Sequence, residues 1–302
     1  MTAPLFFPRF IEARDGTPLR TVVFEARDAR AVCVLLQGHC EFIEKYGEVF
    51  SELNGRGFTV AAFDWRGQGG SARALPDSLK AHVRDFAEYD SDLTAFLEQV
   101  VRPLAPEPPL LLGHSMGGHL ALRALHDRPG TFRAAVLSSP MIAIQTGAYS
   151  EWMTRLAVAL HMLAGRGEDF AWGMAQRDPL RTEFSRQLCT SDPERFARTQ
   201  EIIKANPAIR LAGPSWSWLA AAYRSMATVT APGYAEAIET PVLVFGAGHD
   251  RIVHVEATAS FAARLPHGTY AGIEEAEHEI LMERDPFRAR FWDAFDAFVK
   301  KL

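Results

Sequence analysis

Apolar and polar residues follow one another along the first half of the chain in a repeating order of strand and then helix. Residues 31–36 form a continuous β-prone run, which is typical of a strand covered on both faces. Segments 6–12 and 19–26 flank the turn at 14–17 and predict a β-hairpin. Length and spacing predict further strands over 57–63, 110–112, 134–137, 242–245 and 269–273, and helices over 43–55, 86–101, 116–126, 254–264 and 286–299.

The alternation stops between residues 141 and 235. No strong strand is predicted there, and an apolar face along 152–163 indicates an amphipathic helix. Repeated strand and helix units imply an α/β fold, with a mostly parallel central sheet and helices on both faces. We therefore expect residues 1–140 and 236–302 to form this core. A helical cap of residues 141–235 would cover the carboxyl ends of the strands, where ligands bind in open α/β sheets.

A candidate nucleophile lies where one of these strands meets a helix. Gly113-His-Ser-Met-Gly117 directly follows the strand at 110–112 and opens the next helix. A turn this sharp strains the backbone at Ser115 and leaves no room for side chains two positions away on either side. The pattern predicts a serine hydroxyl exposed at the sheet edge. The alternative is a turn of small residues that only lets helix and strand pack.

A serine hydroxyl needs a base, usually a histidine held by a carboxylate. His278 lies in the loop between the strand at 269–273 and the last helix, so it can reach over the serine. Asp250 follows the strand at 242–245 after a glycine turn and can bind the second nitrogen of that ring. The alternatives are a solvated loop histidine and a helix N-cap. The chain order Ser115, Asp250, His278 is the one expected for this kind of fold.

Acyl transfer also needs two N–H donors for the developing oxyanion. The backbone N–H of Met116, just after the nucleophile, is the first. The loop after the strand at 31–36 supplies the second, which we assign to His39 because Gly38 allows a turn that points this N–H inward. Alternatively, Gly38 only ends the strand.

These motifs resemble the α/β-hydrolase superfamily, and within it the serine aminopeptidase S33/Hydrolase_4 group, which holds monoacylglycerol lipases and bacterial lysophospholipases of the L2 type. The resemblance covers nearly the whole chain. It implies an α/β-hydrolase fold with Ser115 as nucleophile, Asp250 as acid, His278 as base, and His39 and Met116 as oxyanion donors. The segments that carry it are 37–46, 63–71, 113–118, 139–140, 248–253 and 277–279.

The chain departs from the pattern of this group at three positions. Gln37 and Gln68 stand where histidine is usual, and His119 stands where a small residue is common. The segment Asp64-Trp-Arg-Gly-Gln-Gly69 is expected to shape a turn beside the site.

Composition narrows the classes of partner. The 302 residues contain 32 Lys and Arg against 37 Asp and Glu, a net charge of −5, which argues against a nucleic-acid groove. No apolar run approaches the ~20 residues that span a bilayer, and the N-terminal residues do not have the pattern of a secretory signal. Cys33, Cys40 and Cys189 are sparse and lack metal spacing, so we expect no metal, no cofactor and a cytoplasmic protein.

The sequence therefore predicts a serine hydrolase that cleaves lipid esters, as a lysophospholipase or a monoacylglycerol lipase. The alternatives are a carboxylesterase of short-chain esters and a non-catalytic ligand-binding protein on the same fold. Residues 151–235 hold 10 Lys and Arg against 8 Asp and Glu, a balance of +2 that favours a phosphate-bearing substrate. Action on a lipid substrate would bring the cap into brief contact with the inner face of a membrane. The oligomeric state is left open.

Overall fold

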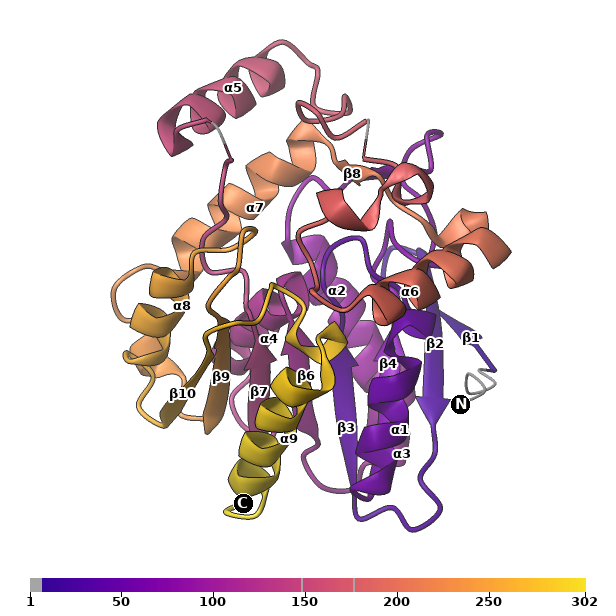
Figure 1. Cartoon of the computed structure of the whole chain (residues 1–302), viewed down its shortest axis with the longest axis vertical. Coiled ribbons are helices and arrows are strands. Elements are labelled where there is room, and N and C mark those ends of the chain that lie inside the picture. The colour runs from indigo at the N-terminus through magenta and orange to yellow at the C-terminus, as the bar shows by residue number, and fades with distance from the viewer. Residues whose placement is uncertain (1–6, 148, 176) are drawn as a thin grey trace.

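A twisted central sheet dominates the computed structural model, which describes residues 7–147, 149–175 and 177–302 (Figure 1). In this part of the chain the sheet has eight strands in the order β1-β2-β4-β3-β6-β7-β9-β10. The β1–β2 and β2–β4 pairs are antiparallel and all other pairs are parallel, so the predicted α/β fold is confirmed. The strands are β1 (Arg9–Glu12), β2 (Pro18–Phe24), β3 (Ala31–Leu36), β4 (Phe58–Phe63), β6 (Leu110–His114), β7 (Ala134–Ser138), β9 (Val242–Ala247) and β10 (Gly268–Ile273).

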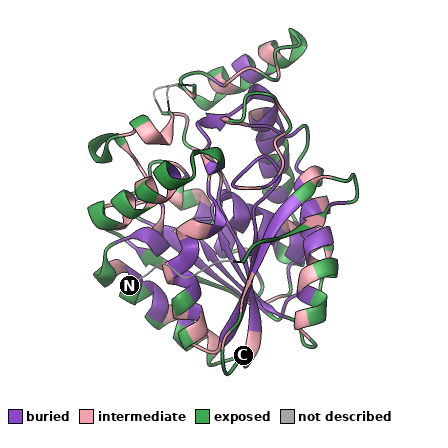
Figure 2. Ribbon diagram, turned by 90° about the vertical axis from the view of Figure 1, so that its right-hand side faces the viewer, coloured by how far each residue is buried: buried purple, intermediate pink, exposed green. Residues whose placement is uncertain are grey.

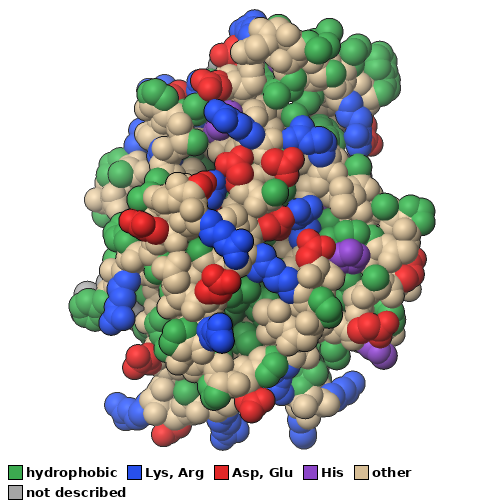
Figure 3. All heavy atoms as spheres, turned by 180° about the vertical axis from the view of Figure 1, so that it is seen from behind, with side chains coloured by type: hydrophobic (Ala, Val, Ile, Leu, Met, Phe, Trp, Pro, Cys, Tyr) green, Lys and Arg blue, Asp and Glu red, His purple; other side chains and the backbone are tan. Residues whose placement is uncertain are grey.

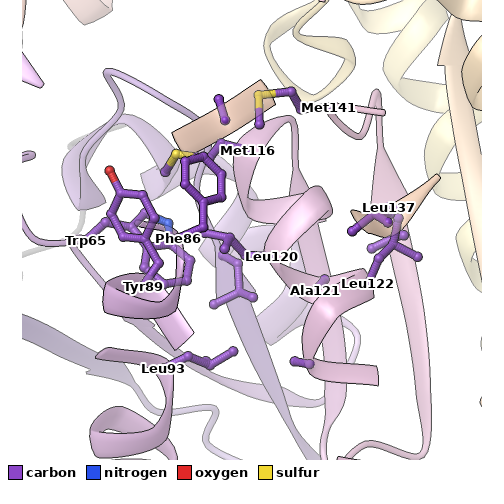
Figure 4. Packing of buried hydrophobic residues seen from close by; sticks show 14 of the residues in the cluster. Trp65, Phe86, Tyr89, Leu93, Met116, Leu120, Ala121, Leu122, Leu137 and Met141 are labelled. Carbon is purple, nitrogen blue, oxygen red and sulfur yellow. The ribbon is translucent and has the colours of Figure 1, made fainter. Parts of the chain in front are cut away.

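Helices cover both faces of this sheet. The helices are α1 (Gly47–Gly55), α2 (Ala87–Phe96), α4 (Met116–Asp127), α8 (Val255–Ala262) and α9 (Asp285–Val299). Successive side chains of a strand point to opposite faces. In β3, Cys33 and Leu35 accordingly join the apolar cluster of α1 and α9, whereas Val34 and Leu36 join the cluster of α2, α4 and α8. Figure 2 shows the buried strands between these layers, and Figure 4 shows part of the second cluster around Phe86 and Leu120.

Several predicted boundaries shift in the structure. The strand predicted over 6–12 begins at Arg9, and residue 6 lies outside the described part of the chain. The helix predicted over 43–55 opens with a 3₁₀ turn, Ile43–Tyr46, before α1. The helix predicted to stop before Pro103 widens into a π turn and continues as α3 (Arg102–Leu104). Proline is tolerated there because it lies in the first turn of the new segment.

The segment between β7 and β9 lies over the carboxyl ends of the strands (Figure 1). It holds α5 (Glu151–Leu163), α6 (Pro193–Ala205), α7 (Trp216–Val229) and β8 (Gly213–Pro214). The two-residue strand β8 pairs in parallel with β5 (Lys80–Ala81) and was not predicted, because a pair this short has no hydrophobic alternation. The boundaries of the cap at 141 and 235 stay a prediction.

Helix α6 is joined to the core by polar contacts. Asp192 accepts hydrogen bonds from the first N–H groups of α6 and Pro193 opens it, a favourable helix start. Arg195 on α6 lies 2.6 Å from the Glu48 carboxylate on α1. The Thr190 hydroxyl donates to the Met282 carbonyl at 2.7 Å, so the segment before α6 contacts the chain just after His278.

Helix α5 is held differently. Ala157 and Val158 bury one face against α7, and the His161 ring stacks on Trp216 at a centroid distance of 4.1 Å. The other face is apolar and exposed, and Figure 3 shows hydrophobic side chains gathered at this end of the molecule. The exposed apolar residues of α5 are Trp152, Met153, Leu156, Leu160, Met162 and Leu163. None of the helices in the described residues has the length and apolar character needed to cross a bilayer.

Candidate active site

Ser115 occupies a strained turn between β6 and α4. Its φ and ψ are 51° and −117°, a region that residues with a side chain rarely adopt. The turn is held because the Ser115 N–H donates to the Ser138 carbonyl and the Met141 N–H donates to the Ser115 carbonyl, both at 3.0 Å. A Cβ at Gly117 would lie 2.2 Å from the Leu36 carbonyl oxygen. The second glycine of the motif is therefore required by the close approach of β3.

The structure brings the three predicted triad residues together. His278 Nε2 lies 2.9 Å from Ser115 Oγ, and His278 Nδ1 lies 2.6 Å from Asp250 Oδ2. The three residues are 4–7% exposed. Their separation along the chain, 163 and 28 positions, is bridged because the loops after β6, β9 and β10 lie at one edge of the sheet. The arrangement can pass a proton from the hydroxyl to the ring.

Asp250 is oriented by its own loop. Its Oδ1 accepts hydrogen bonds from the N–H groups of Ile252 at 2.8 Å and Val253 at 2.9 Å, which leaves Oδ2 for the ring. It does not cap α8, because that helix begins at Val255 after His254. Burial raises the pKa of Asp250, but the charge of the adjoining His278 and these hydrogen bonds outweigh it, so the pKa lies below its ordinary value. The carboxylate is ionised at neutral pH.

The loop after β3 runs directly beside Ser115. A Cβ at Gly38 would lie 3.1 Å from Ser115 Cβ and 2.7 Å from Glu41 Oε2, so glycine is needed for this approach. The left-handed residue of the loop is Cys40, with a φ of 63°, and not Gly38 as the expected turn would require. In the described part of the chain the backbone N–H groups of His39 and Met116 donate to no protein acceptor. Their role as oxyanion donors stays a prediction.

Gln68 braces this loop, a contact that the sequence analysis missed. Its amide nitrogen donates to the Gly38 carbonyl and its amide oxygen accepts from the Cys40 N–H, both at 3.0 Å. The two bonds hold the backbone on either side of His39. An indication of this contact was present in the sequence, because Gln68 stands where histidine is usual in the turn beside the site. Asp64, from the same turn, accepts hydrogen bonds from Arg20 Nε at 2.7 Å and the Ile43 N–H at 2.9 Å.

Helix α7 packs against the loop after β3 beside the site. The His39 ring packs on Trp218 with centroids 4.2 Å apart, and Trp218 Nε1 donates to the Tyr89 hydroxyl at 3.0 Å. Burial lowers the pKa of His39 to about 4, so the ring is neutral at pH 7. The structure gives a reason for histidine at position 119, where a small residue is usual. His119 Nε2 hydrogen-bonds Ser225 Oγ at 2.6 Å and so joins α4 to α7.

A buried charged cluster adjoins the loop after β3, where the Gly38 N–H donates to Glu41 Oε2. Single ligand atoms of Glu41, His114 and Glu279 lie within 4.8 Å of one another, a grouping that can hold a metal ion. The Lys45 ammonium already lies 2.7 Å from Glu41 Oε1 and 2.6 Å from Glu279 Oε1. The positive charge that these carboxylates need is therefore supplied by Lys45.

Comparison with known proteins decides the family. The family model described as serine aminopeptidase, S33, matches residues 27–285. The chain belongs to this serine aminopeptidase S33 family. It is a hydrolase of the serine α/β-hydrolase class, as the motifs predicted.

Two relatives of the chain are named as lipid ester hydrolases. The chain is 31% identical over 283 residues to lysophospholipase L2 of Escherichia coli, covering 91% of this chain and 82% of the relative. It is 26% identical over 238 residues to a monoacylglycerol lipase of Mycolicibacterium smegmatis, covering 79% and 76%.

Solved structures have the same fold. A monoacylglycerol lipase of Paleococcus ferrophilus matches with a TM-score of 0.73 and 25% identity, over 93% of this chain and 98% of the other. A soluble variant of the Saccharomyces cerevisiae monoglyceride lipase matches with a TM-score of 0.75 and 18% identity, over 99% and 97%.

Proposed function

We propose that this protein hydrolyses carboxylic esters of lipids, with a lysophospholipid or a monoacylglycerol as substrate, through an acyl-enzyme on Ser115. The observation that carries the proposal is the buried chain of contacts from Ser115 Oγ through the His278 ring to Asp250. Triads of this geometry perform acyl transfer on unrelated folds. The lipid part rests on the relatives, which are named lysophospholipase L2 and monoacylglycerol lipase.

The first step is acylation. His278 Nε2 takes the proton of Ser115 Oγ as the oxygen attacks the acyl carbon, and Asp250 holds the ring and stabilises its positive charge. The N–H groups of His39 and Met116 donate to the oxyanion. The imidazolium then gives its proton to the leaving alcohol oxygen, and the ester bond breaks. Water repeats the sequence on the acyl-enzyme and releases the fatty acid.

The segment of residues 141–235 acts as the cap of this site. Two of its four tryptophans, Trp216 and Trp218, are buried. Trp218 packs on His39 in the loop after β3. Trp152 and Trp172 are 66% and 52% exposed, so they do not line an enclosed cleft in this structure. The cap therefore encloses the reacting centre through α7 and presents α5 outward.

Helix α5 is the surface through which the protein contacts lipid. Its outer face carries large apolar side chains, including Trp152, Leu160 and Leu163, and exposed patches of this kind mark interaction sites. An interfacial helix of this type lies in the plane of the membrane and does not span it. Substrate monomers are extracted from that surface into the site below.

A substrate panel tests the proposal. Wild-type protein and Ser115→Ala are assayed on lysophospholipids, monoacylglycerols and p-nitrophenyl esters of increasing chain length. Hydrolysis of the lipid esters by wild type alone supports the proposal. Activity confined to short-chain esters would replace it with a general carboxylesterase. Failure of a fluorophosphonate probe to label Ser115 would indicate a non-catalytic protein.

A further inference from the structure

Lys45 links two loops that come from opposite ends of the chain. It lies in the 3₁₀ turn before α1, and its side chain is only 8% exposed. Its ammonium contacts Glu41 in the loop after β3 and Glu279 in the loop after β10. The side chains of both carboxylates are also nearly buried, at 4% and 12% exposed. A cation held between two carboxylates keeps both in place, because their burial leaves these charges little access to water as an alternative partner.

The contact between Lys45 and Glu41 fixes the loop after β3, which carries the proposed oxyanion donor. Glu41 Oε1 binds Lys45, while Glu41 Oε2 accepts hydrogen bonds from the Gly38 N–H at 2.5 Å and the Tyr46 hydroxyl at 2.6 Å. Gly38 is the residue before His39, whose N–H is the proposed oxyanion donor. The Glu41 carboxylate therefore sets the backbone from which that donor projects.

On the other side the link fixes the loop of the base. Glu279 directly follows His278, and its N–H donates to the Cys189 carbonyl at 2.7 Å. Its carboxylate pairs with Lys45 and also contacts the Cys189 thiol. The His278 ring also lies beside His114, the last residue of β6 before Ser115, with ring centroids 4.9 Å apart. A movement of Glu279 would thus move the ring relative to the serine.

We propose that Lys45 is a positioning residue, which sets the distance between the oxyanion donor of the Gly38–His39 segment and the His278 base by holding Glu41 and Glu279 together. This inference rests on the proposed function of the site. Lys45 itself contacts none of the reacting atoms.

Charge explains why the link is needed. Burial raises the pKa of Glu41, but Lys45 and further partners lower it to about 2, so the carboxylate is ionised at neutral pH. Without the ammonium, the two carboxylates would repel each other unless one took up a proton, and in either case both ion pairs would be lost. Loss of these contacts would allow both loops to shift, and a misplacement of about 1 Å in a catalytic site costs about 10²-fold in rate.

The experiment compares Lys45→Met, Lys45→Arg and wild type on a soluble p-nitrophenyl ester. In Lys45→Met we expect kcat to fall about 10²-fold with KM nearly unchanged, because the loss concerns the transition state. Affinity for an alkyl boronic acid, which forms a tetrahedral adduct with the serine, should fall by a similar factor. Lys45→Arg should regain most of both, since it restores the cation.

Arg56→Met is the control. The Arg56 side chain is 26% exposed, pairs with Asp296 and lies over the Trp292 ring, so it joins the end of α1 to α9 and contacts neither catalytic loop. It should lower the melting temperature and leave kcat unchanged. If Lys45→Met does not fold, Glu279→Gln takes its place, and it should lower kcat and boronate affinity with little change in melting temperature. The double variant Lys45→Met/Glu279→Gln should be no worse than Lys45→Met, because both changes break one link.

The outcomes separate this inference from the proposed function. Wild-type kcat in Lys45→Met, or an equal loss of kcat in Arg56→Met, would overturn the positioning role while ester hydrolysis by wild type stands. Wild-type protein that hydrolyses no ester and takes up no fluorophosphonate would overturn the proposed function, and the positioning role with it.

Discussion

The candidate active site and helix α5 differ in how the polarity of their side chains relates to solvent exposure. Ser115, Asp250 and His278 are polar and 4–7% exposed, whereas Trp152 and Leu163 on α5 are apolar and 66% and 85% exposed. Both regions reverse the usual distribution of residues between interior and surface. Such reversals cost stability, so they are expected where a function requires them.

The contrast shows which partner each region has. The buried polar atoms of the triad are bonded to one another, so their removal from water is compensated inside the protein. The outer face of α5 has no such compensation in the described residues, and an apolar partner outside the protein would supply it. In the proposed function, the chemistry therefore takes place in the buried region and the exposed region contacts lipid. The predictions below test this division.

The largest effect is expected at Ser115, the proposed nucleophile. Ser115→Ala should lower kcat by about 10⁶-fold on both soluble and vesicle-bound esters, because triad members act as a unit. Turnover of both substrate forms at saturating concentration measures this, and thermal unfolding checks that the variant is folded. Substantial activity in the variant would mean that the buried region does not carry the chemistry.

Asp250→Asn should have the next largest effect. An amide in this place favours the wrong tautomer of His278 and cannot stabilise the imidazolium, so kcat should fall by about 10⁴-fold. The loss should again be equal for soluble and vesicle-bound esters. A loss confined to vesicles would contradict the division between the regions.

Helix α5 should behave in the opposite way. In Leu160→Ser/Leu163→Ser, the loss of about 1 kcal/mol of apolar burial at each residue should weaken vesicle binding about 30-fold. Activity on vesicle-bound lipid falls accordingly, while kcat on a soluble ester is unchanged. Sedimentation with phosphatidylethanolamine and phosphatidylglycerol vesicles measures the binding.

The matched control for α5 is Phe10→Ser. Phe10 is 62% exposed, close to the 56% of Leu160, but lies on β1 away from the cap. It should leave vesicle binding unchanged. Equal losses in the control and in the α5 variant would show that general surface hydrophobicity, and not α5, carries the contact.

The smallest effect concerns helix α6, which is joined to the core by charge. Burial raises the pKa of Glu48, but its hydrogen bond with Arg195 and neighbouring arginines lower it from 4.5 to about 2. Because the folded pKa lies below the ordinary value, this pairing stabilises the protein fully above about pH 4.5. The stabilisation is lost as the pH falls toward 2.

Glu48→Gln tests this pairing. The variant should melt a few degrees below wild type at pH 7, and the difference should shrink between pH 4.5 and 2. Thermal unfolding followed by circular dichroism measures both. A difference that is independent of pH would mean that the ionised Glu48 carboxylate does not stabilise α6 on the core.

Much of the architecture could be predicted from local patterns. The continuous apolar run of β3 and the alternation of strands with helices predicted the layers. The glycines around Ser115 predicted the sharp turn, because close approach of backbone segments excludes every other residue. The pairings that local patterns missed, such as β5 with β8, involve too few residues to show a period.

The support of the site was harder to predict. Gln68 on one loop holds Gly38 and Cys40 on another, and Lys45 joins Glu41 to Glu279 across more than two hundred positions. Nothing in the sequence near Lys45 indicates its second partner. Polar residues at these positions are compatible with a solvated surface until the fold buries them.

The sequence by itself determined which residue types are available at the strand ends, because strand period, glycine spacing and chain order are local properties that survive without knowledge of the fold. Only the tertiary structure decided which of them meet. The distance of 2.9 Å between Ser115 and His278, the neutral His39 ring and the burial of Lys45 depend on loops that pack together from distant parts of the chain. Hydrogen bonds and ion pairs act over a few ångströms, and packing alone sets those distances.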